Sequence, residues 1–203
     1  MALDKTETSQ KVLEIAERLL NQGGAPALQA RAIAREAGIS VGSIYNLVGD
    51  LDQLHGMANM RLLDRLGEAG LATSRKLKEK GATDTRERLL ALARTYLAFV
   101  QAHPVGWTAL LAFSPGRMAA DAQSAYETRL DTLFEIIASV LADDKALMVD
   151  NARARLSARV LWSSVHGIVT NSAGRRAQQR QGEGVWDQID LLVTTFLRGM
   201  EPR

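Results

Sequence analysis

The 203-residue sequence contains no cysteine, which excludes disulfides, thiolate metal sites and cysteine nucleophiles. Aromatic residues make up only 5%, whereas alanine, leucine and arginine are abundant, and this mix favours helix over sheet. No apolar run approaches the ~20 residues that cross a bilayer. Residues 1–8 lack the apolar centre of a signal peptide. We therefore expect a soluble cytoplasmic protein.

Strong charge of either sign is also missing. The formal net charge is +2, and residues 1–66 carry seven Lys or Arg against eight Asp or Glu. If this segment binds nucleic acid, the basic surface must come from the local placement of its cations rather than from bulk charge. Hydrophobic residues make up 46% and charged residues 24%, which is typical of a chain with a packed core.

Apolar residues recur at helical spacing along nearly the whole chain, and no stretch alternates as a strand would. The sequence therefore predicts an all-α protein of about nine helices. Residues 73–83 are polar, rich in lysine and include Gly81, which predicts a linker. The expected helices cover residues 12–20, 28–37, 41–47, 51–72, 85–102, 105–113, 119–141, 145–173 and 185–199, with a polar loop at 175–184.

A helix-turn-helix pattern occupies residues 33–45. Gly38 suits the left-handed position that ends a helix, and Ser40 can cap the next one. Ala34 and Ala37 are small enough to let the two helices approach closely. The second helix begins with small residues, so its backbone can approach a duplex and its N-terminal amides suit a phosphate.

Further residues with fixed spacings surround this pattern. They follow an amphipathic first helix and are Gly23, Ile33-Ala34, Ala37-Gly38-Ile39-Ser40, Gly42-Ser43-Ile44-Tyr45 and Asp52-Gln53-Leu54. With them, the first ~66 residues resemble the DNA-binding domain of TetR-like (TetR/AcrR) bacterial regulators. The resemblance implies a three-helix DNA-binding domain over residues 1–50. It also implies a helical ligand-binding and dimerisation domain over 51–203, with the helix 51–72 linking the two.

The resemblance also implies which side chains meet DNA. They would lie on the second helix of the motif and at the start of the first, and they are Gln29, Arg31, Ser40, Val41, Gly42, Ser43, Tyr45 and Asn46. For Tyr45, the alternative is that its ring packs against the first helix of the protein.

Two positions depart from the family's pattern. Val48 stands where an aromatic ring is usual, and Leu51 stands where a lysine usually contacts phosphate. Losing one phosphate contact lowers the expected salt dependence of DNA binding by about one unit. Lys5 and Lys11 in the N-terminal arm are candidates to compensate.

A second group of residues lies in the C-terminal part. Trp162, His166 and Gly167, downstream of His103-Pro104, resemble a C-terminal subtype of the same family that is named for its Trp, His and Gly. We expect a cavity for a small, mostly apolar ligand. The expected lining is Trp107, Leu110, Leu111, Phe113, Met118, Tyr126, Leu130, Trp162 and His166. The alternative is a solid core in which His166 makes a structural hydrogen bond.

The sequence shows no motif that is typical of enzyme catalysis. The three histidines lack metal-ligand spacing, and there is no phosphate-binding glycine loop or nucleophile motif. We therefore predict no enzymatic activity, no metal and no cofactor.

Our hypothesis is a DNA-binding transcriptional regulator, a homodimer through its last two helices. It would be a repressor that leaves a palindromic operator when the ligand binds. The alternative is a small-molecule-binding helical dimer whose DNA binding is weakened or lost, which the acidic balance of residues 1–66 and Leu51 motivate.

Overall fold

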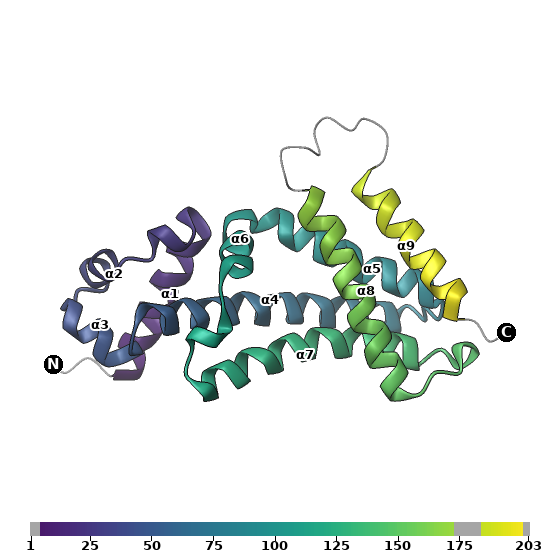
Figure 1. The fold of residues 1–203 in the computed structure, drawn as a ribbon, viewed down its shortest axis with the longest axis horizontal. Coiled ribbons are helices and arrows are strands. Elements are labelled where there is room, and N and C mark those ends of the chain that lie inside the picture. Colours follow the sequence, from purple (N-terminus) through teal and green to yellow (C-terminus); the bar gives the residue numbers. More distant parts are fainter. Residues whose placement is uncertain (1–4, 173–183, 201–203) are drawn as a thin grey trace. The chain divides into compact units, whose positions relative to one another are not determined.

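The computed structural model describes residues 5–172 and 184–200, and all regular structure in these ranges is helical (Figure 1). The prediction of an all-α protein of about nine helices is confirmed for this part of the chain. The α-helices are α1 (Lys5–Gly23), α2 (Ala30–Ala37), α3 (Val41–Val48), α4 (Leu51–Glu79), α5 (Thr85–Ala102), α6 (Pro104–Ala112), α7 (Ala120–Ala142), α8 (Asn151–Ser172) and α9 (Val185–Met200). Three short 3-10 turns are η1 (Ala25–Ala27), η2 (Pro115–Arg117) and η3 (Lys145–Leu147).

The linker predicted at residues 73–83 is wrong for most of its length, because α4 continues to Glu79. Lysine, arginine and leucine are good helix formers, and the cations of the last turn lie where the helix dipole favours them. Two residues beyond the end of the helix, Gly81 adopts a φ of 71°. The amides of Gly81 and Ala82 bond back to the carbonyls of Lys78 and Leu77, which is a Schellman motif.

The helix predicted to begin at residue 145 begins later. Lys145–Leu147 form only the 3-10 turn η3, and Met148 then takes a left-handed φ of 48°, which interrupts the helix. Asp150 restarts it, since its carboxylate accepts a hydrogen bond from the backbone amide of Arg153 at 2.7 Å. The predicted end of this helix at residue 173, and the predicted loop at 175–184 except Gly184, lie outside the described residues.

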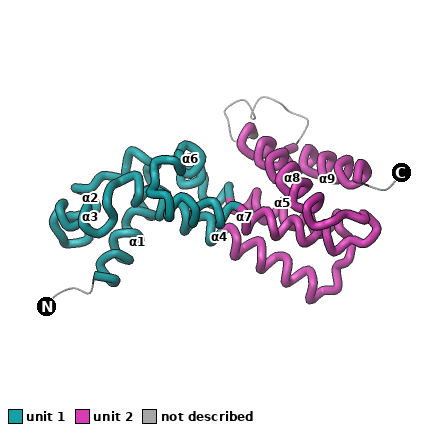
Figure 2. Tube along the Cα trace, turned by 60° about the horizontal axis from the view of Figure 1, so that its bottom comes forward, with its two compact units in different colours: residues 1–65, 100–130 teal, residues 66–99, 131–203 magenta. Residues whose placement is uncertain are grey.

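The chain divides into two compact units, each described here by itself (Figure 2). Unit 1 comprises residues 1–65 and 100–130, and unit 2 comprises residues 66–99 and 131–203. The helix α4 contributes residues to both. This structural division differs from the functional boundary expected at residue 50, because the first half of α4 and all of α6 pack with the N-terminal helices. The division into a DNA-binding and a ligand-binding domain stays a prediction.

The core of unit 1 joins the three N-terminal helices to α4 and α6. The helix α6 packs directly on α1, and α1, α2 and α3 contact one another in pairs. The fully or nearly buried members of this core include Val12, Ala16, Ile33, Ile44 and Leu54. Because the apolar faces of α1, α2 and α3 all turn inward, their opposite faces are left to solvent.

The core of unit 2 comes from α8, α9, most of α5 and the second halves of α4 and α7. Ile189 and Val193 of α9 are buried, at 0% and 2% exposure. At the surface, Arg86 of α5 pairs with Asp190 of α9, and the guanidinium of Arg94 lies 4.3 Å from the ring centre of Trp186. None of the described helices is both long and apolar enough to span a membrane.

Candidate functional site

The helix α3 is the most exposed element of the N-terminal three-helix group. Its N-cap is Ser40, whose hydroxyl oxygen accepts a hydrogen bond from the backbone amide of Ser43 at 3.0 Å. Ile44 and Val48 point into the core of unit 1, while Val41 and Tyr45 are exposed by 37% and 44%. The result is a short capped helix that presents one face outward.

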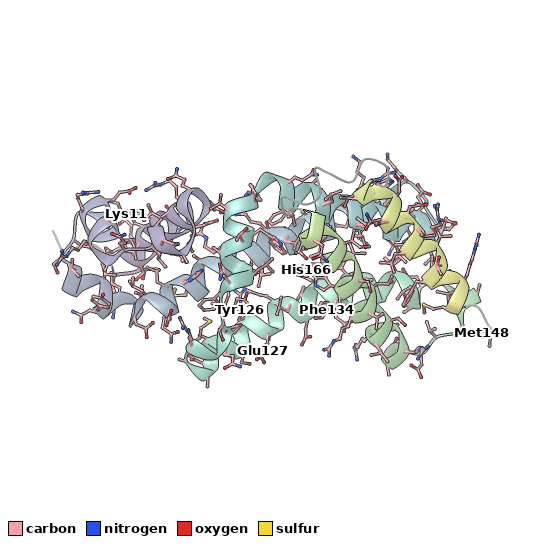
Figure 3. The ribbon with its side chains drawn as sticks, turned by 45° about the horizontal axis from the view of Figure 1, so that its top comes forward. Lys11, Tyr126, Glu127, Phe134, Met148 and His166 are labelled. Atoms are coloured by element: carbon pink, nitrogen blue, oxygen red, sulfur yellow. The ribbon has the colours of Figure 1, made fainter. Side chains whose placement is uncertain are left out.

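The turn before α3 has the geometry that its sequence predicts. Gly38 adopts a φ of 75° and a ψ of 31°, and its amide bonds to the carbonyl of Ala34. Lys11 of α1 donates a hydrogen bond to the carbonyl of Ala37 at 3.1 Å (Lys11 is labelled in Figure 3). Lys11 therefore stabilises the C-terminus of α2, where the helix dipole favours a cation.

The structure places the eight residues expected at DNA on the exposed side of α2 and α3. Ser43 is half-buried, and the other seven are exposed. The side chain of Gln29 donates to the carbonyl of Pro26 at 3.3 Å, and Arg31 is the second residue of α2. The exposure of Tyr45 does not favour the alternative in which its ring is covered by α1.

The two departures from the family's pattern both serve packing. Val48 is 8% exposed and belongs to the core of unit 1, and Leu51 is partly buried against the same core. The Leu51 side chain thus adds to the core of unit 1, whereas a lysine at this position would place a charge in solvent. Lys5 is exposed.

Unit 2 holds an apolar cavity of about 60 Å³. Tyr96 and Trp162 form part of its wall, with ring centroids 4.8 Å apart. The Tyr96 hydroxyl and Nδ1 of His166 hydrogen-bond at 2.7 Å, and burial lowers the pKa of His166 below its ordinary 6.5 (Figure 3 labels His166). The lining residues are Leu66, Gly70, Leu89, Leu92, Ala93, Thr95, Tyr96, Leu133, Ile136, Ile137, Leu161, Trp162, Val165 and Val193.

Of the nine residues expected to line a ligand cavity, only Trp162 lines this one. His166 is bonded to its wall through Tyr96. The other seven belong to unit 1. There, Trp107, Leu110, Met118 and Tyr126 are buried, Phe113 and Leu130 are half-buried, and Leu111 is 44% exposed.

Two of these rings touch each other in unit 1. The centroids of Phe113 and Tyr126 lie 6.1 Å apart, and burial raises the pKa of Tyr126 to about 12. Sequence reasoning missed most of the cavity wall in unit 2, including Tyr96 and Leu133. The available signal was the apolar face shared by α5, α7 and α8, but such a face does not say whether it lines a space or a solid core.

Ionisable groups do not gather into a metal site. Among the described residues, no group of three or more His, Asp or Glu side chains lies close enough to hold an ion. The described site residues offer an exposed face on α2 and α3 in unit 1, and unit 2 holds an apolar cavity.

Comparison with known families assigns both parts of the chain. Residues 12–47 match the family described as bacterial regulatory proteins, tetR family. Residues 89–196, more than half of the chain, match the tetracyclin repressor-like C-terminal domain. The finer resemblance to the Trp-His-Gly subtype stays a prediction.

Individual proteins agree with this assignment. An HTH-type transcriptional regulator of Mycobacterium tuberculosis is 25% identical, over 96% of this chain and 82% of its own. A protein of Mesorhizobium loti assigned to the TetR-family regulators has a similar fold, with a TM-score of 0.71, 17% identity and coverage of 97% and 98%. The multidrug binding protein EbrR, solved with imidazole, gives a TM-score of 0.61, with 19% identity and coverage of 96% and 95%.

Proposed function

Because this chain belongs to the tetR family of bacterial regulatory proteins, we propose that it is a ligand-responsive repressor whose dimer reads a palindromic operator through α3. Membership makes it a transcriptional regulator with a DNA-binding helix-turn-helix rather than an enzyme. The observation that carries the proposal is the division of α3 into a buried apolar face and an exposed face that includes Tyr45 and Asn46. The major groove of B-DNA admits an α-helix, so a helix with one exposed face suits it.

The proposed contacts with DNA fall into two kinds. The N-terminus of α3, with Ser40 and Ser43, offers hydroxyls and amides that suit a phosphate. Asn46 and Gln29 are amide side chains of the kind that pairs with an adenine edge, and Arg31 suits a guanine or a phosphate. Few cations are involved, so we expect DNA binding with a modest salt dependence.

The proposed ligand enters the cavity of unit 2. Its wall is almost entirely aliphatic and aromatic, which suits a small, mostly apolar molecule, and the cavity of about 60 Å³ would have to widen to admit one. The structural neighbour EbrR is described as a multidrug binding protein, which supports a small-molecule ligand. The helix α4 supplies Leu66 and Gly70 to the cavity wall, and its first half packs in unit 1. A ligand that favours one position of α4 would thereby alter the DNA affinity.

The proposed dimer face lies on α8 and α9. Leu156 and Val160 of α8 and Leu191 of α9 are exposed by 55%, 45% and 68%, whereas Ile189 and Val193 of α9 are buried within the chain. Large apolar side chains on the surface of adjacent helices suit a partner with the same surface. A two-fold dimer in turn suits a palindromic site.

The dimer can be tested with two substitutions at equal exposure. Val160→Glu places a charge on the proposed face, whereas Leu71→Glu does so on α4, and both native side chains are 45% exposed. We expect sedimentation to show monomers for Val160→Glu and dimers for Leu71→Glu. A dimeric Val160→Glu protein, at concentrations near those in the cell, would place the interface elsewhere.

DNA reading is tested by footprinting on the DNA upstream of the protein's own gene. Tyr45→Ala removes an exposed ring and hydroxyl from α3, and a lost specific contact costs about 1–3 kcal/mol, so we expect at least about fivefold weaker binding. Gln22→Ala, exposed at the end of α1, is the matched control and should bind as the native protein does. If the native protein prefers no site over random DNA, the alternative of a ligand-binding dimer without operator recognition holds instead.

A further inference from the structure

The hydroxyl groups around the cavity of unit 2 are already paired with other groups of the protein. Two residues of its wall carry a hydroxyl, Thr95 and Tyr96. The Thr95 hydroxyl donates to the carbonyl of Ala91 at 3.1 Å and also shares a hydrogen bond with the hydroxyl of Thr73 at 2.8 Å. The Tyr96 hydroxyl is hydrogen-bonded to Nδ1 of His166. A ligand in the cavity therefore meets two hydroxyls that the protein itself engages.

The rest of the wall offers little to a polar group and nothing to a charge. The lining residues all lie in α-helices, whose backbone amides and carbonyls bond within the helix. The indole N–H of Trp162 is the remaining polar side-chain group of the described wall, and it can only donate. None of the described lining residues carries a charge. Burial lowers the pKa of His166, so the imidazole behind Tyr96 is uncharged at neutral pH.

These features set the cost of admitting each class of ligand. A charged molecule would lose its hydration without gaining a counter-charge, which is the largest penalty. A molecule with an O–H or N–H group would lose its hydrogen bonds to water and find the acceptors of the wall engaged. A hydrocarbon loses no hydrogen bond on entry and gains contacts with leucine, isoleucine and aromatic side chains.

The space itself is small and is bounded in part by a close approach of α4 and α7. An added Cβ at Gly70 of α4 would meet Cδ1 of Ile136 of α7 at 3.3 Å. The volume of about 60 Å³ is below the about 150 Å³ of an apolar cavity that holds benzene. A single ring therefore enters only if flexible ends of side chains, such as that of Ile136, move aside.

We propose that the cavity of unit 2 selects small uncharged hydrocarbons, such as an alkylbenzene, and discriminates against molecules that carry a charge or an O–H or N–H group. The Tyr96–His166 pair is then part of the wall and not a polar anchor for the ligand. That such a hydrocarbon is the effector of DNA binding rests on the proposed function, whereas the selectivity of the cavity does not.

Toluene and phenol are the matched probes, because they differ by a methyl group against a hydroxyl at nearly the same size. The full-length protein, labelled at the isoleucine δ-methyl groups, is titrated without DNA and followed by NMR. We expect toluene to bind saturably, with nuclear Overhauser contacts to Ile136 and Ile137 of the wall and none to Ile33 or Ile44 in the core of unit 1. Phenol should bind at least about fivefold more weakly. Benzylamine, which is a cation at neutral pH, should show no binding.

Substitutions in the wall show whether binding occurs in this space. Ala93→Leu extends a buried side chain of the wall and should abolish toluene binding. Ala98→Leu makes the same change at an exposed position of α5 outside the wall, and it should leave toluene binding unchanged. If Ala93→Leu does not fold, Gly70→Ala narrows the cavity from α4 and should weaken toluene binding.

The proposal is overturned if the toluene titration does not saturate, or if phenol binds as tightly as toluene. Saturable binding of benzylamine at Ile136 would overturn it as well, as would toluene binding that survives the substitutions in the wall. Phenol or benzylamine bound at Ile136 would leave the cavity a ligand site and refute only its selectivity for hydrocarbons. None of these results bears on operator recognition, since no DNA is present, and a failed footprint would leave the titrations unaffected.

Discussion

Glu17 of α1 is a buried carboxylate whose removal should weaken unit 1 more than the loss of any exposed ion pair on the same helix. Its side chain is 8% exposed and pairs with two arginines of α4, Arg61 at 3.2 Å and Arg65. The neighbouring residue Arg18 pairs instead with Glu36 of α2, and both of those side chains are more than 40% exposed. Glu17→Gln and Glu36→Gln are therefore matched substitutions in buried and exposed ion pairs.

The expected magnitudes follow from burial. Glu17→Gln leaves two guanidinium groups without their counter-charge, and removing one partner of a fully buried ion pair costs about 3–5 kcal/mol, whereas exposed pairs contribute up to about 1 kcal/mol. The Glu17 pairs lie between these limits. Since Arg61 and Arg65 are 34% and 44% exposed, they can regain water, so we place the loss near the lower end, at about 2 kcal/mol. Glu36→Gln should cost about 0.2–1 kcal/mol, as exposed pairs do.

The assay is urea unfolding followed by the fluorescence of Trp107, which is buried in α6 of unit 1. Replacing the tryptophans of unit 2, Trp162 and Trp186, with phenylalanine makes Trp107 the sole reporter, and all variants are compared in that background. Protein concentration is kept equal, because any dimer adds to the apparent stability. Equal losses for Glu17→Gln and Glu36→Gln would refute the reasoning that burial decides the contribution of these pairs.

Three further predictions concern the turn of the helix-turn-helix motif and the cavity of unit 2. Gly38→Ala should destabilise by about 1–2 kcal/mol because its φ is 75°; no atom lies within 4 Å of the added Cβ, so no clash adds to this cost. Gly42→Ala, inside α3, should instead stabilise by about 0.5–1 kcal/mol. Thermal unfolding measures both changes. Tyr96→Phe should cost about 1 kcal/mol in urea unfolding, since it removes the bond to His166. Because the pKa of His166 is lowered in the folded protein, the unfolded chain takes up a proton first as the pH falls. The stability present above pH 6.5 is therefore lost as the pH falls through the folded pKa. Urea unfolding across a pH series should show a smaller loss for His166→Gln.

The helix-turn-helix could be predicted from sequence because its signals are local. The left-handed Gly38, the capping Ser40 and the buried Ile44 each act within one or two turns of chain, and the structure confirms all three. The lysine-rich segment after residue 73 misled us because polarity indicated a linker, whereas the same residues are good helix formers.

The cavity could not be predicted in the same way, because its wall depends on which helices meet. Periodicity shows that α5, α7 and α8 each have an apolar face, but it does not say which neighbour covers that face. We therefore grouped Trp107 and Phe113 with Trp162, although the first two belong to unit 1 and the last to unit 2.

The most direct test of the central claim is to select DNA sites for the full-length protein from a random-sequence library. If paired copies of α3 read a duplex, repeated selection should enrich a two-fold-symmetric sequence whose half-sites are about 34–36 Å apart, and Tyr45→Ala should fail to enrich it. A library that stays random after selection, or that yields the same sequence with Tyr45→Ala, would contradict the claim.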